Sequence, residues 1–334
     1  MSYPKIELHV HLEGAVSPRA LFAAAKRNGF ALPVGSVEEL ADYMRFRDFE
    51  HFIAAWMATT RALRTERDYR ELVLDYAARA QAQGAVYLEA IFSPADKASV
   101  GVDQQTVFEG FCDGVQEARE TLGLEMRLTP DITRGVDREL ARRTAELAVR
   151  YRERGVVALG LGGLEAQHPP EQYAEAFAIA RAGGLGSVPH AGEVAGPASI
   201  RGALDALHAD RIRHGVRAVE DPGLLRELAD RQLVLDVCVL SNVCLSVVPS
   251  VEAHQLPQLL AAGVPCTVNT DDPTFFSCDL DAEHTAARSL GADPRALFEA
   301  GVAGALCDAA TKDALRAVAE GYWPARPAAP VAAG

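Results

Sequence analysis

The chain has 334 residues, 49% of them hydrophobic, which is enough for a large buried core, and barrels of this length commonly form one domain. The formal net charge is −13 and acidic residues interrupt the arginine-containing stretches, so we do not expect a nucleic-acid partner. No apolar run could span a bilayer, the N-terminus lacks the pattern of an export signal, and the six cysteines form no CxxC pair, so we expect a cytoplasmic protein with reduced thiols that binds no membrane.

The first predicted element is a strand over residues 5–12, KIELHVHL, in which His9 and His11 lie two positions apart. Residues i and i+2 of a strand point to the same face, so both imidazoles would project to one side. A single HxH pattern in a strand is more often a coincidence than a metal site. The pair is therefore either a surface accident or two ligands of one metal ion, and the later elements must decide.

Residues 15–84 separate the first and second predicted strands and contain several helical patterns. Five residues at helical spacing predict one aromatic face: Phe46, Phe49, Phe52, Ile53 and Trp56. For any single one of them, core packing is the better explanation. A long insertion after a barrel strand lies over the active-site end, however, so we predict lid helices at about 15–84 that shield a flat substrate.

Short apolar runs then alternate with longer helical patterns along the chain. The second to eighth predicted strands are 85–94, 124–132, 156–163, 185–193, 211–215, 233–242 and 264–273. The predicted helices include 66–84, 136–155, 169–184 and 221–232. Eight such units predict a (β/α)8 barrel. A doubly wound sheet is the alternative, but it usually carries a glycine-rich phosphate turn after its first strand, and HVHLEGAVSP is not one.

The alternation extends over residues 1–323, which we assign to one barrel domain. Residues 324–334 are rich in proline, alanine and glycine and predict a flexible tail. No residue pattern in the tail indicates chemistry.

Polar side chains stand where four of the predicted strands end. These are His9 and His11, His190 and Glu193, His214, and Asp271 and Asp272. Because the carboxyl ends of barrel strands open onto one face, we expect these side chains to converge. Each short motif is weak alone, and only their conjunction indicates a site. A structural role is expected for the remaining histidines, His51, His168, His208, His254 and His284.

Three imidazoles and one carboxylate suit Zn²⁺ or a similar metal, whereas a structural zinc more commonly involves cysteine. The candidate ligands are His9, His11, His190 and Asp271. They would leave a coordination position for water, whose pKa the metal lowers to about 7. Glu193 and His214 would remain beside it as titratable groups for proton transfer.

Five motifs, ELHVHLEGA, PHAGE, DRIRHG, LSN and NTDDP, resemble the adenosine deaminase family in their order, and the similarity runs from residue 4 to about residue 320. That family is a (β/α)8 barrel with one zinc ion. The resemblance implies one Zn²⁺ per chain, held by the four candidate ligands. It implies that Glu193 gives a proton to purine N1, that His214 orients the hydroxide, and that Asp272 helps to position it and contacts N7. The implied substrate-binding residues are His11, Glu13, Gly163 and Asp272.

The resemblance implies hydrolytic deamination of a 6-aminopurine nucleoside, with adenosine or 2′-deoxyadenosine as the first choice. Family members that act on free adenine tend to have serine in place of Gly163, so glycine favours a nucleoside. Glu13 replaces an aspartate that contacts the sugar 5′ end in adenosine-specific members. Leu164 replaces a common acidic residue, and CVLSN at 238–242 lacks the family's proline. A 5′-modified adenine nucleoside such as aminodeoxyfutalosine is therefore the close alternative, followed by free adenine.

Two other classes of function remain open at this point. A hydrolase of a cyclic amide or phosphoester would need two metals, bridged in related enzymes by a modified lysine on strand four, and VVALGLGG at 156–163 has no lysine. A catalytically degenerate purine-binding protein would explain the unusual CVLSN segment. The complete set of polar residues at the strand ends argues against it.

Overall fold

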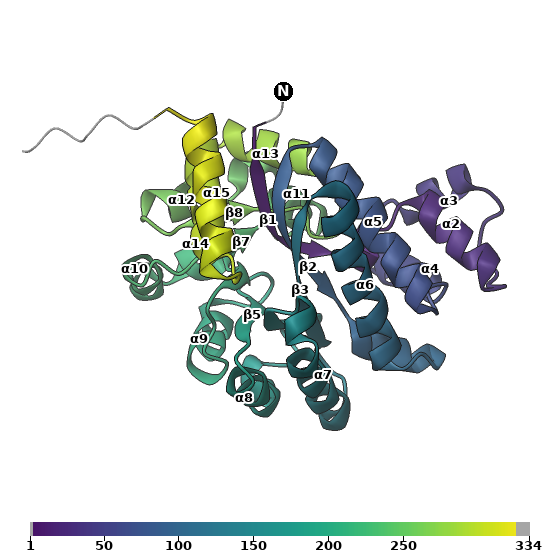
Figure 1. The fold of residues 1–334 in the computed structure, drawn as a ribbon. Helices are drawn as coiled ribbons and strands as arrows, with labels where there is room; N and C mark the ends of the chain where they lie inside the picture. Colours follow the sequence, from purple (N-terminus) through teal and green to yellow (C-terminus); the bar gives the residue numbers. More distant parts are fainter. Residues whose placement is uncertain (1–2, 325–334) are drawn as a thin grey trace, which may run out of the picture.

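The computed structural model describes residues 3–324. Eight strands in this range form one parallel sheet in the order β1 to β8 (Figure 1). The strands are β1 Lys5–His11, β2 Ala85–Phe92, β3 Glu125–Thr133, β4 Ala158–Gly162, β5 Gly186–Ala191, β6 Ile212–His214, β7 Leu235–Val237 and β8 Cys266–Val268. The residues after β8 return to β1, because His11 N–H donates to Asp271 O at 2.8 Å and Asp271 N–H to His9 O at 3.2 Å. The predicted (β/α)8 barrel is confirmed.

Helices surround the strands, and short 3-10 helices occupy several loops. The α-helices are α1 Leu12–Ala15, α2 Pro18–Arg27, α3 Val37–Met44, α4 Phe49–Thr60, α5 Glu66–Ala82, α6 Gln104–Leu122, α7 Arg138–Arg150, α8 Ala174–Ala182, α9 Pro197–Ala206, α10 Pro222–Asp230, α11 Val239–Cys244, α12 Leu256–Ala261, α13 Leu280–Ser289, α14 Pro294–Gly304 and α15 Ala309–Tyr322. The 3-10 helices are η1 Pro94–Val100, η2 Arg152–Arg154, η3 Pro170–Tyr173, η4 Val216–Glu220 and η5 Val251–Ala253. None of the helices in this described part is long and apolar enough to cross a membrane.

Charged side chains, rather than apolar ones alone, occupy the inside of the barrel. Arg211 is fully buried and contacts Asp236 at 2.5 Å and Glu89 at 2.8 Å. Arg213, equally buried, pairs with Asp131. Buried charges of this kind persist only when they are paired, so these contacts hold β2, β3, β6 and β7 together beneath the strand ends.

The segment between β1 and β2 contains α1 to α5, and Figure 1 shows α2, α3 and α4 to one side of the barrel, beyond α5. The ring of Phe52 lies 5.4 Å from that of Phe275, and Trp56 lies 5.6 Å from the same ring. This packing joins α4 to the loop that follows Asp272. Ile53 is 39% exposed, so its predicted place on the packed aromatic face is wrong.

Whether these helices act as a lid stays a prediction, since contact with one loop is not closure over a site. The described cysteines are all free thiols, and Cys112, Cys238 and Cys266 are buried. The predicted tail at 324–334 lies outside the described residues, apart from Pro324.

Candidate active site

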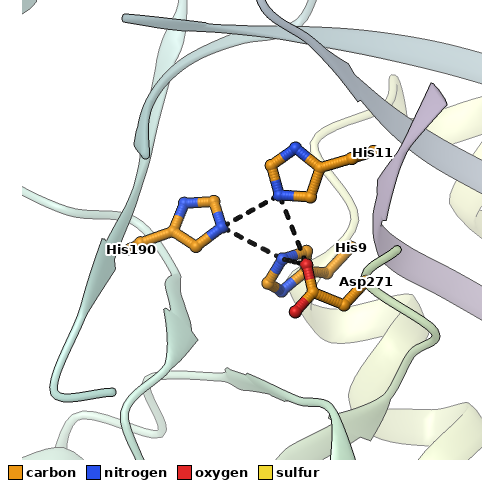
Figure 2. Close-up of side chains that lie close together, drawn as sticks. All are labelled: His9, His11, His190 and Asp271. Carbon is orange, nitrogen blue, oxygen red and sulfur yellow. Dashed lines mark hydrogen bonds and ion pairs between the residues drawn. The ribbon is translucent and has the colours of Figure 1, made fainter. Parts of the chain in front are cut away.

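Four side chains predicted as metal ligands meet at the carboxyl end of the barrel, and Figure 2 shows them pointing toward one another. His190 Nε2 lies 3.1 Å from His9 Nε2 and 3.2 Å from His11 Nε2. Asp271 Oδ1 lies 3.3 Å from His9 Nε2 and 3.4 Å from His11 Nε2. The strand ends of β1 and β5 and the residues after β8 therefore place four ligand atoms around one point.

These distances fit a tetrahedral metal ion. Ligand atoms about 2.0–2.1 Å from a tetrahedral zinc are separated by about 3.4 Å from one another. Burial lowers the pKa of His9 and of His190 well below the usual range, and that of His11 to about 4, so the rings are neutral and carry lone pairs. Neighbouring lone pairs repel unless a cation lies between them, which makes this donor set suitable for a metal.

Hydrogen bonds on the far side of the ligands orient them. His190 Nδ1–H donates to Leu161 O at 2.8 Å, which leaves Nε2 free as a ligand. Ser241 Oγ–H donates to Asp271 Oδ2 at 2.6 Å, so Oδ1 is the oxygen that faces the histidines. Outer partners of this kind select the tautomer and the ring orientation of a metal ligand.

Glu193 lies beside this cluster, with Oε1 at 3.5 Å from His214 Nε2. That oxygen is buried and has no hydrogen-bond partner among the described residues. Burial raises the pKa of Glu193 to about 7, and the negative charges of Asp271 and Glu165 contribute to this rise. The carboxyl is therefore able to hold a proton near neutral pH, as a general acid must.

The loop that carries Glu193 is fastened by one buried carboxylate. Glu165 accepts hydrogen bonds from four consecutive backbone N–H groups, of Gly192 at 2.5 Å, Glu193 at 3.2 Å, Val194 at 2.8 Å and Ala195 at 2.9 Å. Glu165 is 4% exposed. The connection after β4 thus sets the position of the loop after β5.

Asp272 lies against Gly14. A Cβ atom at Gly14 would lie 1.7 Å from Asp272 Oδ1, so only glycine permits this approach. Burial raises the pKa of Asp272 well above its usual range, and the nearby charges of Asp271, Glu13 and Glu193 add to that effect. Its Oδ1 is buried and has no hydrogen-bond partner in the described part of the chain.

Glu13 lies in α1, directly after β1, and Gly163 lies in the loop after β4. Glu13 is fully buried and accepts a hydrogen bond from Ser93 N–H at 3.1 Å, while its Oε2 has no hydrogen-bond partner among residues 3–324. The nearby Lys97 is 3% exposed, and its charge lowers the pKa of Glu13 against the larger effect of burial. Gly163 has φ +92°, a conformation that favours glycine.

His214 and Asp271 share an unusual backbone conformation, with φ of +62° and +61°. Left-handed φ in a non-glycine residue costs of the order of 1 kcal/mol and clusters at functional sites. His214 is the last residue of β6, and Asp271 lies three residues after the end of β8.

The structure brings together the seven strand-end side chains that the sequence predicts to converge. The sequence did not single out three residues that are hydrogen-bonded to the loop of Glu193 or, directly or through another side chain, to His214. Glu165 stands in the GGLE segment and Asn242 in the LSN motif, so both could have been singled out as polar residues next to a strand end. His254 was assigned a structural role, and no local pattern distinguishes it.

Comparison with known proteins supports the same reading. Residues 4–320 match the family described as adenosine deaminase. An aminodeoxyfutalosine deaminase of Acidothermus cellulolyticus is 47% identical over 329 residues, which cover 96% of this chain and 92% of the relative. The crystal structure of an adenine deaminase from Arthrobacter aurescens has a TM-score of 0.90 at 30% identity and covers 96% of this chain and 99% of its own.

A third similar protein carries a metal. The crystal structure of an amidohydrolase from Burkholderia ambifaria, described with bound Zn, has a TM-score of 0.87 at 26% identity and covers 96% of this chain and 90% of its own. These similarities identify a hydrolase that acts on carbon–nitrogen bonds. The substrates named for the relatives favour the alternative predictions of aminodeoxyfutalosine or adenine over adenosine. The family match over residues 4–320, the order of the motifs and the fold all agree, and this chain belongs to the adenosine deaminase family.

Proposed function

We propose that the enzyme removes the 6-amino group of an adenine nucleoside that is modified at the 5′ position, of which aminodeoxyfutalosine is an example. The relative that is 47% identical over 96% of the chain carries that substrate in its name. Gly163 also favours a nucleoside, because the family members that act on free adenine tend to have serine there. Glu13 at the sugar end, in place of aspartate, is consistent with a substituent other than the 5′-hydroxyl.

Free adenine is the second candidate, supported by the likeness to the adenine deaminase structure. Adenosine and 2′-deoxyadenosine, the first choice from the sequence, have less support than either. All these substrates present the same purine edge, so they differ only in what lies at the sugar end of the site.

One Zn²⁺ per chain is the metal that His9, His11, His190 and Asp271 suit best, because three neutral nitrogen atoms and one carboxylate oxygen match its preferred ligands. When bound, zinc lowers the pKa of a coordinated water to about 7 and so supplies hydroxide at neutral pH. The remaining chemistry belongs to the side chains around it.

The purine ring presents three nitrogen lone pairs, and the site offers a donor for each. Glu193, with its raised pKa, is able to protonate N1 as water adds to C6 and ammonia leaves. Asp272, also with a raised pKa, is able to donate a hydrogen bond to N7. The backbone N–H of Gly163 is the proposed donor to N3. His214, next to Glu193, orients the attacking hydroxide.

The observation that carries this proposal is Oε1 of Glu193, which is buried, has no hydrogen-bond partner among the described residues and lies beside the four converging donor atoms. A buried carboxyl oxygen without a hydrogen bond within the described part of the chain is free to act on a ligand, and protonation of a ring nitrogen uses it directly. We further propose that the helices at about 15–84 cover the substrate, since α4 packs on the loop that follows Asp272.

Ammonia release from the zinc-loaded enzyme tests the proposal, with aminodeoxyfutalosine, adenosine, 2′-deoxyadenosine and adenine compared at equal concentrations. We expect the highest kcat/KM for the 5′-modified nucleoside and one zinc per chain by metal analysis. A higher kcat/KM for adenine would assign the second function. Absence of ammonia release from all four substrates, with zinc bound, would refute the deaminase proposal.

A further inference from the structure

A chain of hydrogen bonds runs from the backbone of Leu256 to the ring of His214. Leu256 N–H donates to His254 Nδ1 at 2.9 Å. His254 Nε2 lies 3.1 Å from Asn242 Oδ1, and Asn242 Nδ2 lies 3.4 Å from His214 Nδ1. The side chains of His254, Asn242 and His214 are all buried.

The first bond sets the direction of the others. A backbone N–H can only donate, so His254 Nδ1 must accept and cannot carry a proton. Burial lowers the pKa of His254 to about 4, so at neutral pH the ring carries one proton, which must lie on Nε2. That N–H donates to Asn242 Oδ1.

The amide orientation of Asn242 then follows. Because its oxygen accepts from His254, its NH₂ group faces His214 Nδ1, and an amide NH₂ can only donate. His214 Nδ1 is therefore an acceptor without a proton, and the ring carries its proton on Nε2. This nitrogen is the one at 3.5 Å from Glu193 Oε1 and 3.9 Å from Asp271 Oδ2.

We propose that Asn242 and His254 are positioning residues that hold His214 in the Nε2–H tautomer, so that the ring meets the reacting oxygen as a hydrogen-bond donor. In the opposite tautomer Nε2 would present a lone pair to Asp271 Oδ2, which also presents a lone pair. A donor at this position holds an anionic oxygen, whereas an acceptor repels it. The kinetic part of this inference rests on the proposed deaminase function, and the tautomer part does not.

The tautomer is measured on the zinc-loaded full chain labelled with ¹⁵N-histidine. Long-range ¹H–¹⁵N spectra distinguish a protonated from an unprotonated ring nitrogen, and the signals of His214 are those that vanish in His214→Gln. We expect the proton on Nε2. A proton on Nδ1 of His214 would overturn the inference, whatever substrate the enzyme uses.

Substitution of Asn242 tests the kinetic consequence. In Asn242→Asp a carboxylate replaces the NH₂ donor, accepts from His214 Nδ1 and so moves the proton to that nitrogen. We expect kcat to fall by about 100-fold or more, as a wrong histidine tautomer does in other hydrolases, with KM changed by less than about threefold and zinc retained. A kcat within about threefold of the unsubstituted enzyme, or a loss of zinc that accounts for the lower kcat, would contradict the positioning role.

His254 offers a matched pair of variants. Gln at this position keeps an N–H donor for Asn242 Oδ1, whereas Ala removes this donor and lets the side-chain amide of Asn242 rotate by 180°. We expect His254→Gln to keep kcat within about threefold and His254→Ala to lose about tenfold. The control is His284→Gln, since His284 is also buried but bonds to Tyr3 instead, and its kcat should not change. Equal kcat values for the two His254 variants would refute the proposal.

Discussion

The most informative single substitution is Glu165→Gln, because one carboxylate serves four backbone N–H groups. The amide has one oxygen, and its most favourable orientation keeps that oxygen near the three groups bonded to Oε2. The N–H of Gly192 would then face an NH₂ group. One charge-assisted bond is lost in a buried place and three become neutral, so we expect the free energy of unfolding to fall by about 3–5 kcal/mol.

The same change should act on the proposed proton donor. The loop held by Glu165 includes Glu193, so a displaced loop lowers kcat. Loss of the negative charge at Glu165 also lowers the pKa of Glu193, because that charge helps to raise it. Above this pKa Glu193 has lost its proton, so the decline of kcat/KM at alkaline pH should begin at a lower pH in the variant.

The assay is urea unfolding of the zinc-loaded protein together with a pH profile of kcat/KM. Glu153→Gln is the matched control, since the side chain of Glu153 is 83% exposed and the substitution should leave both measurements unchanged. An unfolding free energy for Glu165→Gln within about 0.5 kcal/mol of the unsubstituted protein would show that the four hydrogen bonds do not fasten the loop.

Three further predictions follow from single contacts. Glu193→Gln should lower kcat by about 100- to 10,000-fold while metal analysis still finds zinc, since the amide cannot supply the proton, and full activity on the best substrate would refute the assigned role. Gly14→Ala should abolish measurable turnover, because its Cβ would lie 1.7 Å from Asp272 Oδ1; unchanged kcat/KM would mean that the position of Asp272 is not needed. Burial lowers the pKa of His284 from 6.5 to about 3. Below about pH 6.5 the unfolded chain therefore binds a proton at His284 that the folded chain does not bind, so the free energy of unfolding falls as the pH falls. His284→Gln should remove up to about 1.4 kcal/mol per pH unit of that dependence between pH 6 and pH 4, and equal slopes of unfolding free energy against pH would contradict this.

The barrel and the meeting of its strand-end side chains were predictable because both depend on short-range patterns. Alternating apolar runs and helical spacings specify strand and helix, and a parallel barrel brings every strand end to one face. His9, His190 and Asp271 could therefore be expected to meet although up to about 260 residues separate them. The roles of these residues remain predictions until they are measured.

The contacts that orient those side chains depend on the tertiary structure alone. Glu165 accepts hydrogen bonds from a loop after another strand, and His254 is linked to His214 through Asn242. No periodicity of the sequence encodes the directions of these bonds. Ile53 shares the spacing of its aromatic neighbours but is exposed, because packing against Phe275 selects which face of α4 is buried. Sequence periodicity thus determined the architecture and the face of the barrel that carries the site. The packing of distant segments decided which atom of each side chain faces the site. The reason is that the direction of a hydrogen bond depends on three-dimensional contact and not on position along the chain.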